Sequence, residues 1–136
     1  MKKYKLIIPL MVAIFWIGSC AKNDSIDPDF KLGEAFEIKV NHSVVNQNED
    51  VKFRITKIVE DSRCPEEVMC VWEGQVRMEV EIEIDGSTYT KELIYYSSNP
   101  MEFGGYKFRV LSVLPGNQID ETIPIEDYVF SMLIEK

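Results

Sequence analysis

Cysteine is the residue with the most distinctive chemistry in this sequence, and its three copies occur in two settings. Cys20 follows a long apolar run, whereas Cys64 and Cys70 bracket a short segment in the middle of the chain. A thiol can form a disulfide, bind zinc or carry a covalent modification. The sequence has a single histidine, His42, and no Gly-x-Ser-x-Gly elbow accompanies it. The sequence therefore offers cysteine chemistry without a catalytic constellation.

The segment before Cys20 has the organisation of a secretory signal. Three lysines within the first five positions precede an apolar stretch at 6–17. At ~1.5 Å per helical residue this stretch reaches about 18 Å, which is short of a ~30 Å hydrocarbon core. The small residues Gly18 and Ser19 follow it, as a signal peptidase requires. We expect residues 1–19 to be a signal peptide.

The end of this signal resembles the lipobox of bacterial lipoproteins, on the residues Ile17-Gly18-Ser19-Cys20. The resemblance implies that the Cys20 thiol carries a diacylglycerol and that Cys20 becomes the first residue of the mature chain. Buried acyl chains stabilise membrane attachment by ~0.8 kcal/mol per methylene, so two or three chains would anchor the protein durably. The resemblance implies an outer membrane lipoprotein of the cell envelope. The alternative is an ordinary secreted protein with a coincidental cysteine.

Residues 20–33 are predicted to form a flexible tether, because they are polar, acidic and poor in apolar side chains. Their early aspartates resemble the acidic export signals of Bacteroides-group lipoproteins that are sent to the cell surface. Asp24-Ser25-Ile26 resembles the O-glycosylation sites of that group, which implies a modification of Ser25. These resemblances imply a surface-exposed lipoprotein.

With Cys20 modified, Cys64 and Cys70 remain as an even pair in an oxidising compartment, which favours a disulfide. The loop-entropy argument gives roughly 2.4 kcal/mol for closing so short a loop. Pro65-Glu66-Glu67 is typical of the first turn of a helix, so a single pinned turn is expected. Zinc bound by the two cysteines, His42 and a carboxylate is the alternative, without the paired spacings of known sites. We expect no cofactor.

The residues around this cysteine pair also resemble a family. Asp61-Ser62-Arg63-Cys64-Pro65 followed by Cys70-Val71-Trp72-Glu73-Gly74 is similar to a segment of small uncharacterised Bacteroides-group lipoproteins. Gly105-Tyr106, Pro115 and Asp127-Tyr128 follow in a similar order, although members commonly have a small residue in place of Glu73. The resemblance implies an extracytoplasmic all-β domain and supplies no activity.

Alternating apolar and polar residues predict β-strands across residues 34–136. The clearest run is 76–84, and Asp85-Gly86 then supplies a type I′ turn that pairs it with 87–95, Ile84 facing Ser87. Further strands are predicted at 36–40, 51–55, 106–114 and 128–134, with 46–50 as the turn between the first two. The pattern favours an antiparallel, immunoglobulin-like β-sandwich, with a small β-barrel as the alternative.

Several single residues have both a structural and a functional interpretation. Trp72 is expected to pack as core over the disulfide rather than to stack on a ligand. We expect His42 to be a solvated side chain. The acidic turn 48–50 could be considered for calcium, but it lacks the spaced oxygen ligands of a calcium-binding loop. Arg63 could recognise a carboxylate of a ligand, but the expected partner is local, one of Asp61, Glu66 and Glu73.

The charge balance restricts the partners. The chain has 15 Lys and Arg against 23 Asp and Glu, which argues against nucleic acid and anionic lipid. The leading hypothesis is a non-enzymatic, lipid-anchored envelope domain that binds a protein or glycan through the disulfide loop. A structural or assembly subunit and a loop-type protease inhibitor presenting residues 65–69 are the alternatives. The candidate binding residues, whose apolar members could face outward or plug the sandwich, are Glu66, Glu67, Val68 and Met69.

Overall fold

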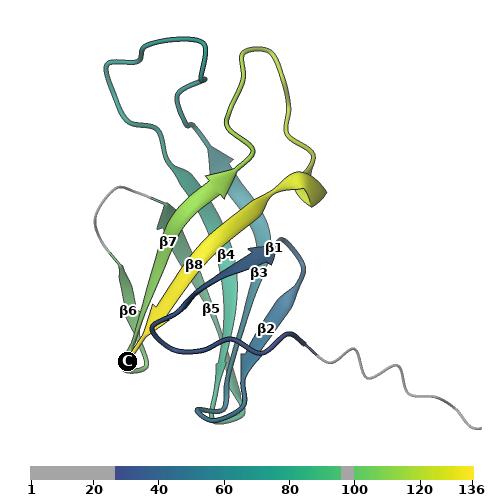
Figure 1. Cartoon of the computed structure of the whole chain (residues 1–136), viewed down its shortest axis with the longest axis vertical. Coiled ribbons are helices and arrows are strands. Elements are labelled where there is room, and N and C mark those ends of the chain that lie inside the picture. Colours follow the sequence, from purple (N-terminus) through teal and green to yellow (C-terminus); the bar gives the residue numbers. More distant parts are fainter. Residues whose placement is uncertain (1–26, 96–99) are drawn as a thin grey trace, which may run out of the picture.

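Two four-stranded antiparallel sheets face each other in the computed structural model, which describes residues 27–95 and 100–136 (Figure 1). One sheet has the strand order β1-β8-β7-β6 and the other has the order β2-β3-β4-β5. The expected antiparallel β-sandwich is confirmed. The strands are β1 (Ala35–Lys39), β2 (Ser43–Asn46), β3 (Val51–Asp61), β4 (Val76–Ile84), β5 (Ser87–Tyr95), β6 (Met101–Phe103), β7 (Tyr106–Leu114) and β8 (Val129–Glu135).

The strand order differs from that of an immunoglobulin domain, although the sandwich architecture is shared. Immunoglobulin sheets place strands side by side that are distant in sequence. Here β2 to β5 form one meander, β6 to β8 form another, and β1 returns to the edge of β8. The strands follow one another in the cyclic order of an up-and-down barrel that has been flattened into two sheets.

The hairpin of β4 and β5 has the register that its turn dictates. Asp85 and Gly86 adopt φ values of 48° and 74°, as the two central positions of a type I′ turn require. Ile84 faces Ser87 at the turn, and the pairing continues without a shift to the far end of both strands. Lys91, whose position on the inner face is unusual, places its Nζ 4.4 Å from the ring centre of Phe103. The predicted register is confirmed.

The start of the sandwich differs from the prediction. Residues 36–40 and 51–55 are not the two arms of one hairpin, because β1 pairs with β8 in one sheet and β3 lies in the other. An additional strand, β2, pairs with β3 across the turn at 46–50. Asn41, at a φ of 64°, lies in the connection between the two sheets. The alternation of residues is interrupted there, and that interruption marks the change of sheet.

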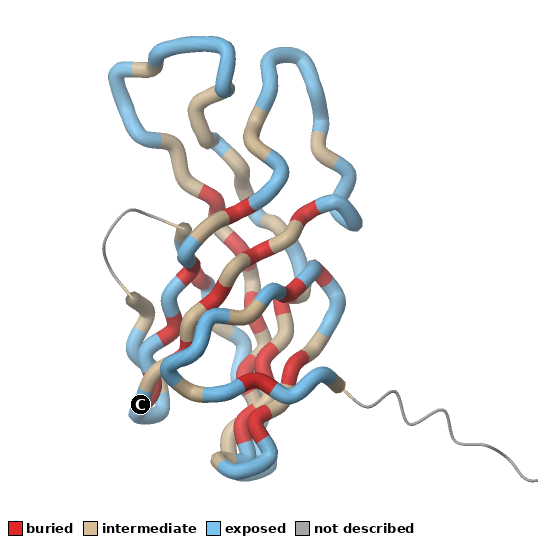
Figure 2. The backbone as a smooth tube through the Cα atoms, in the orientation of Figure 1, coloured by how far each residue is buried: buried red, intermediate tan, exposed pale blue. Residues whose placement is uncertain are grey.

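The core lies between the two sheets and draws on nearly every strand (Figure 2). The rings of Phe53 from β3 and Phe108 from β7 stack across it with their centres 5.7 Å apart. β7 and β8 lie at the centre of their sheet, as their apolar residues on both faces predict. The inner faces of β3, β4, β7 and β8 are therefore committed to packing.

The folded part of the chain extends further towards the N-terminus than the expected boundary at Glu34. Phe30 is only 2% exposed, and its N–H donates to the Val45 carbonyl at 2.9 Å. The Asn46 side chain donates to the Phe30 carbonyl at 3.0 Å, and Asp27 accepts a hydrogen bond from Ser43. Burial of the Phe30 ring, together with these hydrogen bonds, docks the polar segment on the sandwich. The signal segment, Cys20 and Ser25 lie outside the described residues.

Candidate functional site

Two long connections project from the same end of the sandwich (Figure 1). The disulfide loop, residues 62–75, joins β3 to β4, and the β7–β8 loop, residues 115–128, contains the short 3-10 helix η1 (Ile125–Asp127). We call the two together the loop end. The Glu66 N–H donates to the Asn117 carbonyl at 2.9 Å, and the Asn117 side chain donates to the Arg63 carbonyl at 2.7 Å. Each loop therefore supports the other.

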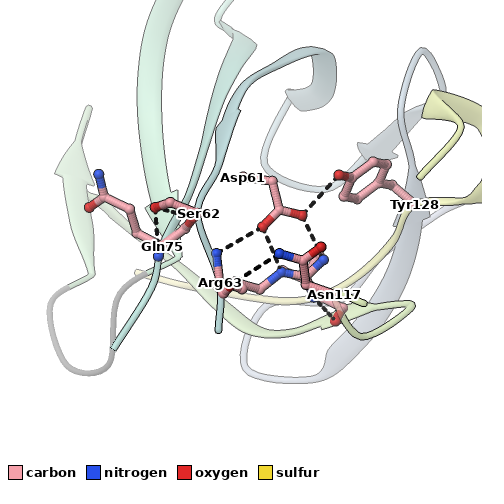
Figure 3. Close-up of polar contacts among 7 residues, drawn as sticks. Asp61, Ser62, Arg63, Gln75, Asn117 and Tyr128 are labelled. Atoms are coloured by element: carbon pink, nitrogen blue, oxygen red, sulfur yellow. Dashed lines mark hydrogen bonds and ion pairs between the residues drawn. The ribbon is translucent and has the colours of Figure 1, made fainter. Parts of the chain in front are cut away.

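A largely buried ion pair fixes the base of the disulfide loop (Figure 3). The Arg63 guanidinium donates two hydrogen bonds to the Asp61 carboxylate, from Nε at 2.9 Å and from Nη2 at 2.7 Å. Its Nη1 donates to the Val113 carbonyl at 2.8 Å, and the Tyr128 hydroxyl donates to Asp61 Oδ2 at 2.9 Å. The expected pairing of Arg63 with a local carboxylate is confirmed. The network joins the ends of three strands, so Arg63 serves the scaffold.

The network shifts the pKa values of its members. Burial raises the pKa of the Asp61 carboxyl, but the hydrogen bonds from Arg63 and Tyr128 outweigh it and hold this pKa below its usual range. Burial and the hydrogen bond to Asp61 raise the pKa of the Tyr128 hydroxyl to about 12. Asp61 therefore stays ionised and Tyr128 stays protonated over the physiological range.

Tyr128→Phe is expected to lower the free energy of unfolding by about 2 kcal/mol at neutral pH, because it removes a hydrogen bond to a charged group. The folded pKa of Tyr128 lies above its ordinary value of 10.0. The stabilisation is therefore complete below pH 10 and is lost as the pH rises through about 12. Urea unfolding of both proteins between pH 8 and pH 12 should show the two curves converging above pH 10. A difference independent of pH would contradict this role.

The expected disulfide is present between Cys64 and Cys70, with the Cα atoms 5.9 Å apart. The expected single turn is present as well, because the Val68 N–H donates to the Pro65 carbonyl at 3.2 Å. The Sγ atoms of Cys64 and Cys70 are bonded to each other, so neither is a thiolate that could bind zinc. Within residues 27–95 and 100–136, no group of three or more His, Cys, Asp and Glu side chains is placed to hold a metal ion.

Gly74 allows the two ends of the disulfide loop to lie in contact. A Cβ at this position would lie well under 3.0 Å from the Ser62 carbonyl oxygen and the Arg63 Cα, which are both backbone atoms. The Ser62 N–H donates to the Gln75 carbonyl at 2.8 Å beside this contact. The glycine that ends the Cys-x-Trp-x-Gly segment is therefore required by the close approach of the first residues of the loop.

The apolar side chains of the disulfide loop face outward. Met69 is 99% exposed, Val71 93% and Trp72 68%, and Val68 is also exposed. The sequence left the orientation of Val68 and Met69 open, and the outward one is observed. We call Met69, Val71 and Trp72 the apolar tip. Ile119, on the neighbouring β7–β8 loop, is exposed as well.

The prediction that Trp72 belongs to the core is wrong. The disulfide loop projects beyond the ends of β3 and β4 (Figure 1). The indole of Trp72, in that loop, is 68% exposed and is therefore not covered by the sheets. Sequence reasoning also missed Val71 as a candidate. The available signal was four apolar residues within 68–72 that follow no strand or helix period inside a loop closed by cysteines.

His42 and the acidic turn 48–50 lie away from the loop end, and the side chains of His42 and Glu49 have partners within the domain. His42 is exposed in the connection between β1 and β2, and its Nδ1 lies 3.1 Å from the Val40 carbonyl oxygen, as expected of a solvated histidine. Glu49 binds Lys136 and accepts a hydrogen bond from the Tyr106 hydroxyl at 3.2 Å. Of the expected binding residues, Glu67 accepts a long hydrogen bond of 3.4 Å from the Ile119 N–H. The loop end is thus the candidate site.

No helix within residues 27–95 and 100–136 combines the length and the apolar character of a membrane span. Comparisons with protein-family models, with curated proteins and with solved structures found no match for the chain.

Proposed function

We propose that this protein is a lipid-anchored, non-enzymatic binding domain of the cell envelope that holds a protein partner through its loop end. The lipobox-like segment ending at Cys20 supports the lipid anchor and the outer membrane location. The chemistry of the loop end supports binding rather than catalysis, because the largely buried charged pair at its base, Asp61 and Arg63, is consumed by the scaffold.

The exposed apolar tip carries the proposal. An isolated exposed leucine is normal on a protein surface, whereas Met69, Val71 and Trp72 lie within four positions and are each at least 68% exposed. Tryptophan and methionine are enriched at the centres of protein interfaces, where a few anchors supply most of the affinity. Aliphatic side chains such as Val71 favour a protein partner over a glycan, whose binding depends on polar groups and flat aromatic faces.

The scaffold beneath the tip lowers the entropy that binding would remove. The disulfide closes the loop, the Asn117 contacts support it from the side, and the Asp61–Arg63 pair fixes its base. A loop ordered before binding loses less conformational freedom when a partner covers it. The same apolar residues on an unsupported loop would bind more weakly.

The geometry also supports a tip that points away from the anchoring membrane. The chain joins the sandwich at Asp27, which forms an ion pair with Lys52 near the start of β3. The disulfide loop follows the other end of β3, and the 11 residues of that strand span about 36 Å. A lipid at the N-terminus and a binding tip at the far end of the domain suit a partner located outside the membrane.

The combined substitution Met69→Ser, Val71→Ser and Trp72→Ser is expected to reduce partner capture at least ~10-fold while the melting temperature changes little, because these side chains contact mainly solvent. Capture is measured in intact cells with a photo-crosslinking amino acid at position 68, beside the tip. Leu111→Ser, an exposed apolar residue on the face of β7, is the matched control and should leave capture unchanged.

Two results would contradict parts of the proposal separately. Undiminished crosslinking of the serine variant would mean that the tip is not the binding surface. The full chain with Cys20→Ala retains the tip and should appear in the soluble fraction after a high-salt wash. Its retention on membranes would contradict the lipid anchor without affecting the assignment of the tip.

A further inference from the structure

We infer that the partner of the loop end presents an apolar pocket bordered by lysine and arginine side chains, a basic protein surface. This inference rests on the proposed binding function and adds the chemistry of the partner. Its starting observation is the composition of the two loops. Residues 62–75 and 115–128 together contain seven carboxylates and one basic residue, Arg63, whose charge is matched by Asp61.

Three of the seven carboxylates flank the apolar tip in sequence, the other four lie in the β7–β8 loop, and all seven are exposed. Elsewhere in the described part of the chain, some exposed carboxylates have a cation beside them, as Glu92 has Arg77 at 3.5 Å and Glu102 has Lys107 at 3.6 Å. None of the seven forms an ion pair with a Lys or Arg among the described residues. They are Glu66, Glu67, Glu73, Asp120, Glu121, Glu126 and Asp127.

Both loops project from the same end of the sandwich, so these seven carboxylates, which we call the rim, share that end with the tip (Figure 1). Contacts between the loops through Asn117 and Glu67 hold the β7–β8 loop, with its share of the carboxylates, against the disulfide loop. An apolar centre with a charged, solvent-exposed border is the usual anatomy of a protein interface. A partner that covers Met69 and Trp72 would place the border of its own binding surface against these carboxylates. Lysine and arginine side chains in that border would be attracted by the negative charge.

The same charges exclude two other occupants. A second copy of this chain, tip against tip, would bring two sets of seven carboxylates together, and like charges across an interface are strongly unfavourable. An anionic lipid surface would be repelled for the same reason, and the chain joins the sandwich at the end opposite the tip. A basic protein surface remains as the occupant that satisfies both the apolar and the charged parts of the loop end.

The two parts of the loop end would act on different steps of binding. Exposed rim charges mainly speed the encounter, and their effect is screened over about 8 Å at physiological salt. The apolar tip mainly slows dissociation, because its contacts exclude water. Capture of the partner should therefore depend on ionic strength through the carboxylates and on hydrophobic contact through the tip.

The test reverses the charge of the rim without touching the tip. In the full chain with the photo-crosslinker at position 68, the combined change Glu73→Lys, Glu121→Lys and Glu126→Lys should lower the yield of the adduct at least ~10-fold. For the chain with the unmodified rim, the yield of the adduct should fall several-fold between low salt and 0.3 M salt, as expected for screened charges. The adduct peptide on the partner should contain apolar residues flanked by lysine or arginine.

A control with the same change in charge separates local from global effects. Glu34→Lys, Glu37→Lys and Glu102→Lys alter exposed carboxylates outside the loop end and should leave the yield unchanged. If the variant with the reversed rim keeps its adduct yield while the serine variant of the tip loses its adduct, the inference of a basic partner would be overturned. The proposed binding function would still stand. An undiminished yield in both variants would overturn both.

The identity of the adduct decides the remaining outcomes. A covalent dimer of this chain, a lipid adduct, or a partner peptide that is acidic or uncharged would each overturn the inference. The absence of any adduct from the unmodified tip in intact cells would overturn the inference together with the binding function.

Discussion

Replacing Arg63 by methionine is expected to lower the free energy of unfolding by about 3 kcal/mol, because it leaves one partner of a largely buried ion pair behind. The Arg63 and Asp61 side chains are only 12% and 11% exposed. Without the guanidinium, the Asp61 carboxylate keeps a single side-chain donor, the Tyr128 hydroxyl. The Val113 carbonyl loses its hydrogen bond from Arg63 as well.

Urea unfolding at pH 7 with the disulfide intact measures this effect. Lys57→Met is the matched control, because Lys57 pairs with Glu79 at 3.1 Å while its side chain is 57% exposed, and exposed pairs contribute about 0–1 kcal/mol. Adding Asp61→Asn to Arg63→Met should restore part of the lost stability, since the unpaired charge disappears. A loss below about 1 kcal/mol for Arg63→Met would mean that the ion pair does not hold the base of the loop.

The parts of the fold that the sequence predicts are those with local causes. Asp85-Gly86 specifies its turn by backbone preference, and once Ile84 faces Ser87 the period of two fixes every later pair of the β4–β5 hairpin. The single turn after Cys64 follows likewise from Pro65 at the first position of a helical turn. In each of these cases, residues close in sequence decide the structure.

The parts of the fold that were predicted wrongly depend on contacts between residues that are distant in sequence. The pairing of β1 with β8 joins Ala35 to Leu133, and no local pattern reports which sheet a strand will enter. Phe30 docks against Val45 for the same reason, although the residues around it are polar. The local composition of such a segment shows that it is polar. It does not show whether distant residues form an apolar surface against which its aromatic side chain can pack.

The candidate site was only partly predictable. The disulfide follows from cysteine chemistry. The sequence left the orientation of Val68 and Met69 open, and the exposure of Trp72 depends on how far the loop projects beyond the sheets. A tryptophan beside a disulfide is often core in sandwich domains whose cysteines lie within the strands. Here the cysteines lie outside the strands, and that difference is visible only in three dimensions.

Gly74→Ala is expected to lower the free energy of unfolding by about 3 kcal/mol, which combines the overpacking penalty with a lost backbone hydrogen bond. The new methyl group would overlap the Ser62 carbonyl oxygen and the Arg63 Cα. Both are backbone atoms, so no side-chain rotation relieves the overlap. The two ends of the disulfide loop must separate, and the hydrogen bond from the Ser62 N–H to the Gln75 carbonyl is the nearest one to break.

The separation should also reach the binding surface, because Arg63 lies at the contact and bonds both Asp61 and Asn117. Gly74→Ala is therefore expected to raise hydrogen exchange of the amides of Ser62 and Glu66, measured in the folded protein, as well as to lower the urea midpoint. Gly86→Asn is the matched control, because Gly86 has open space around it and asparagine tolerates its φ of 74°. If Gly74→Ala were no more destabilising than Gly86→Asn, the close approach at Gly74 would not be what holds the loop ends together.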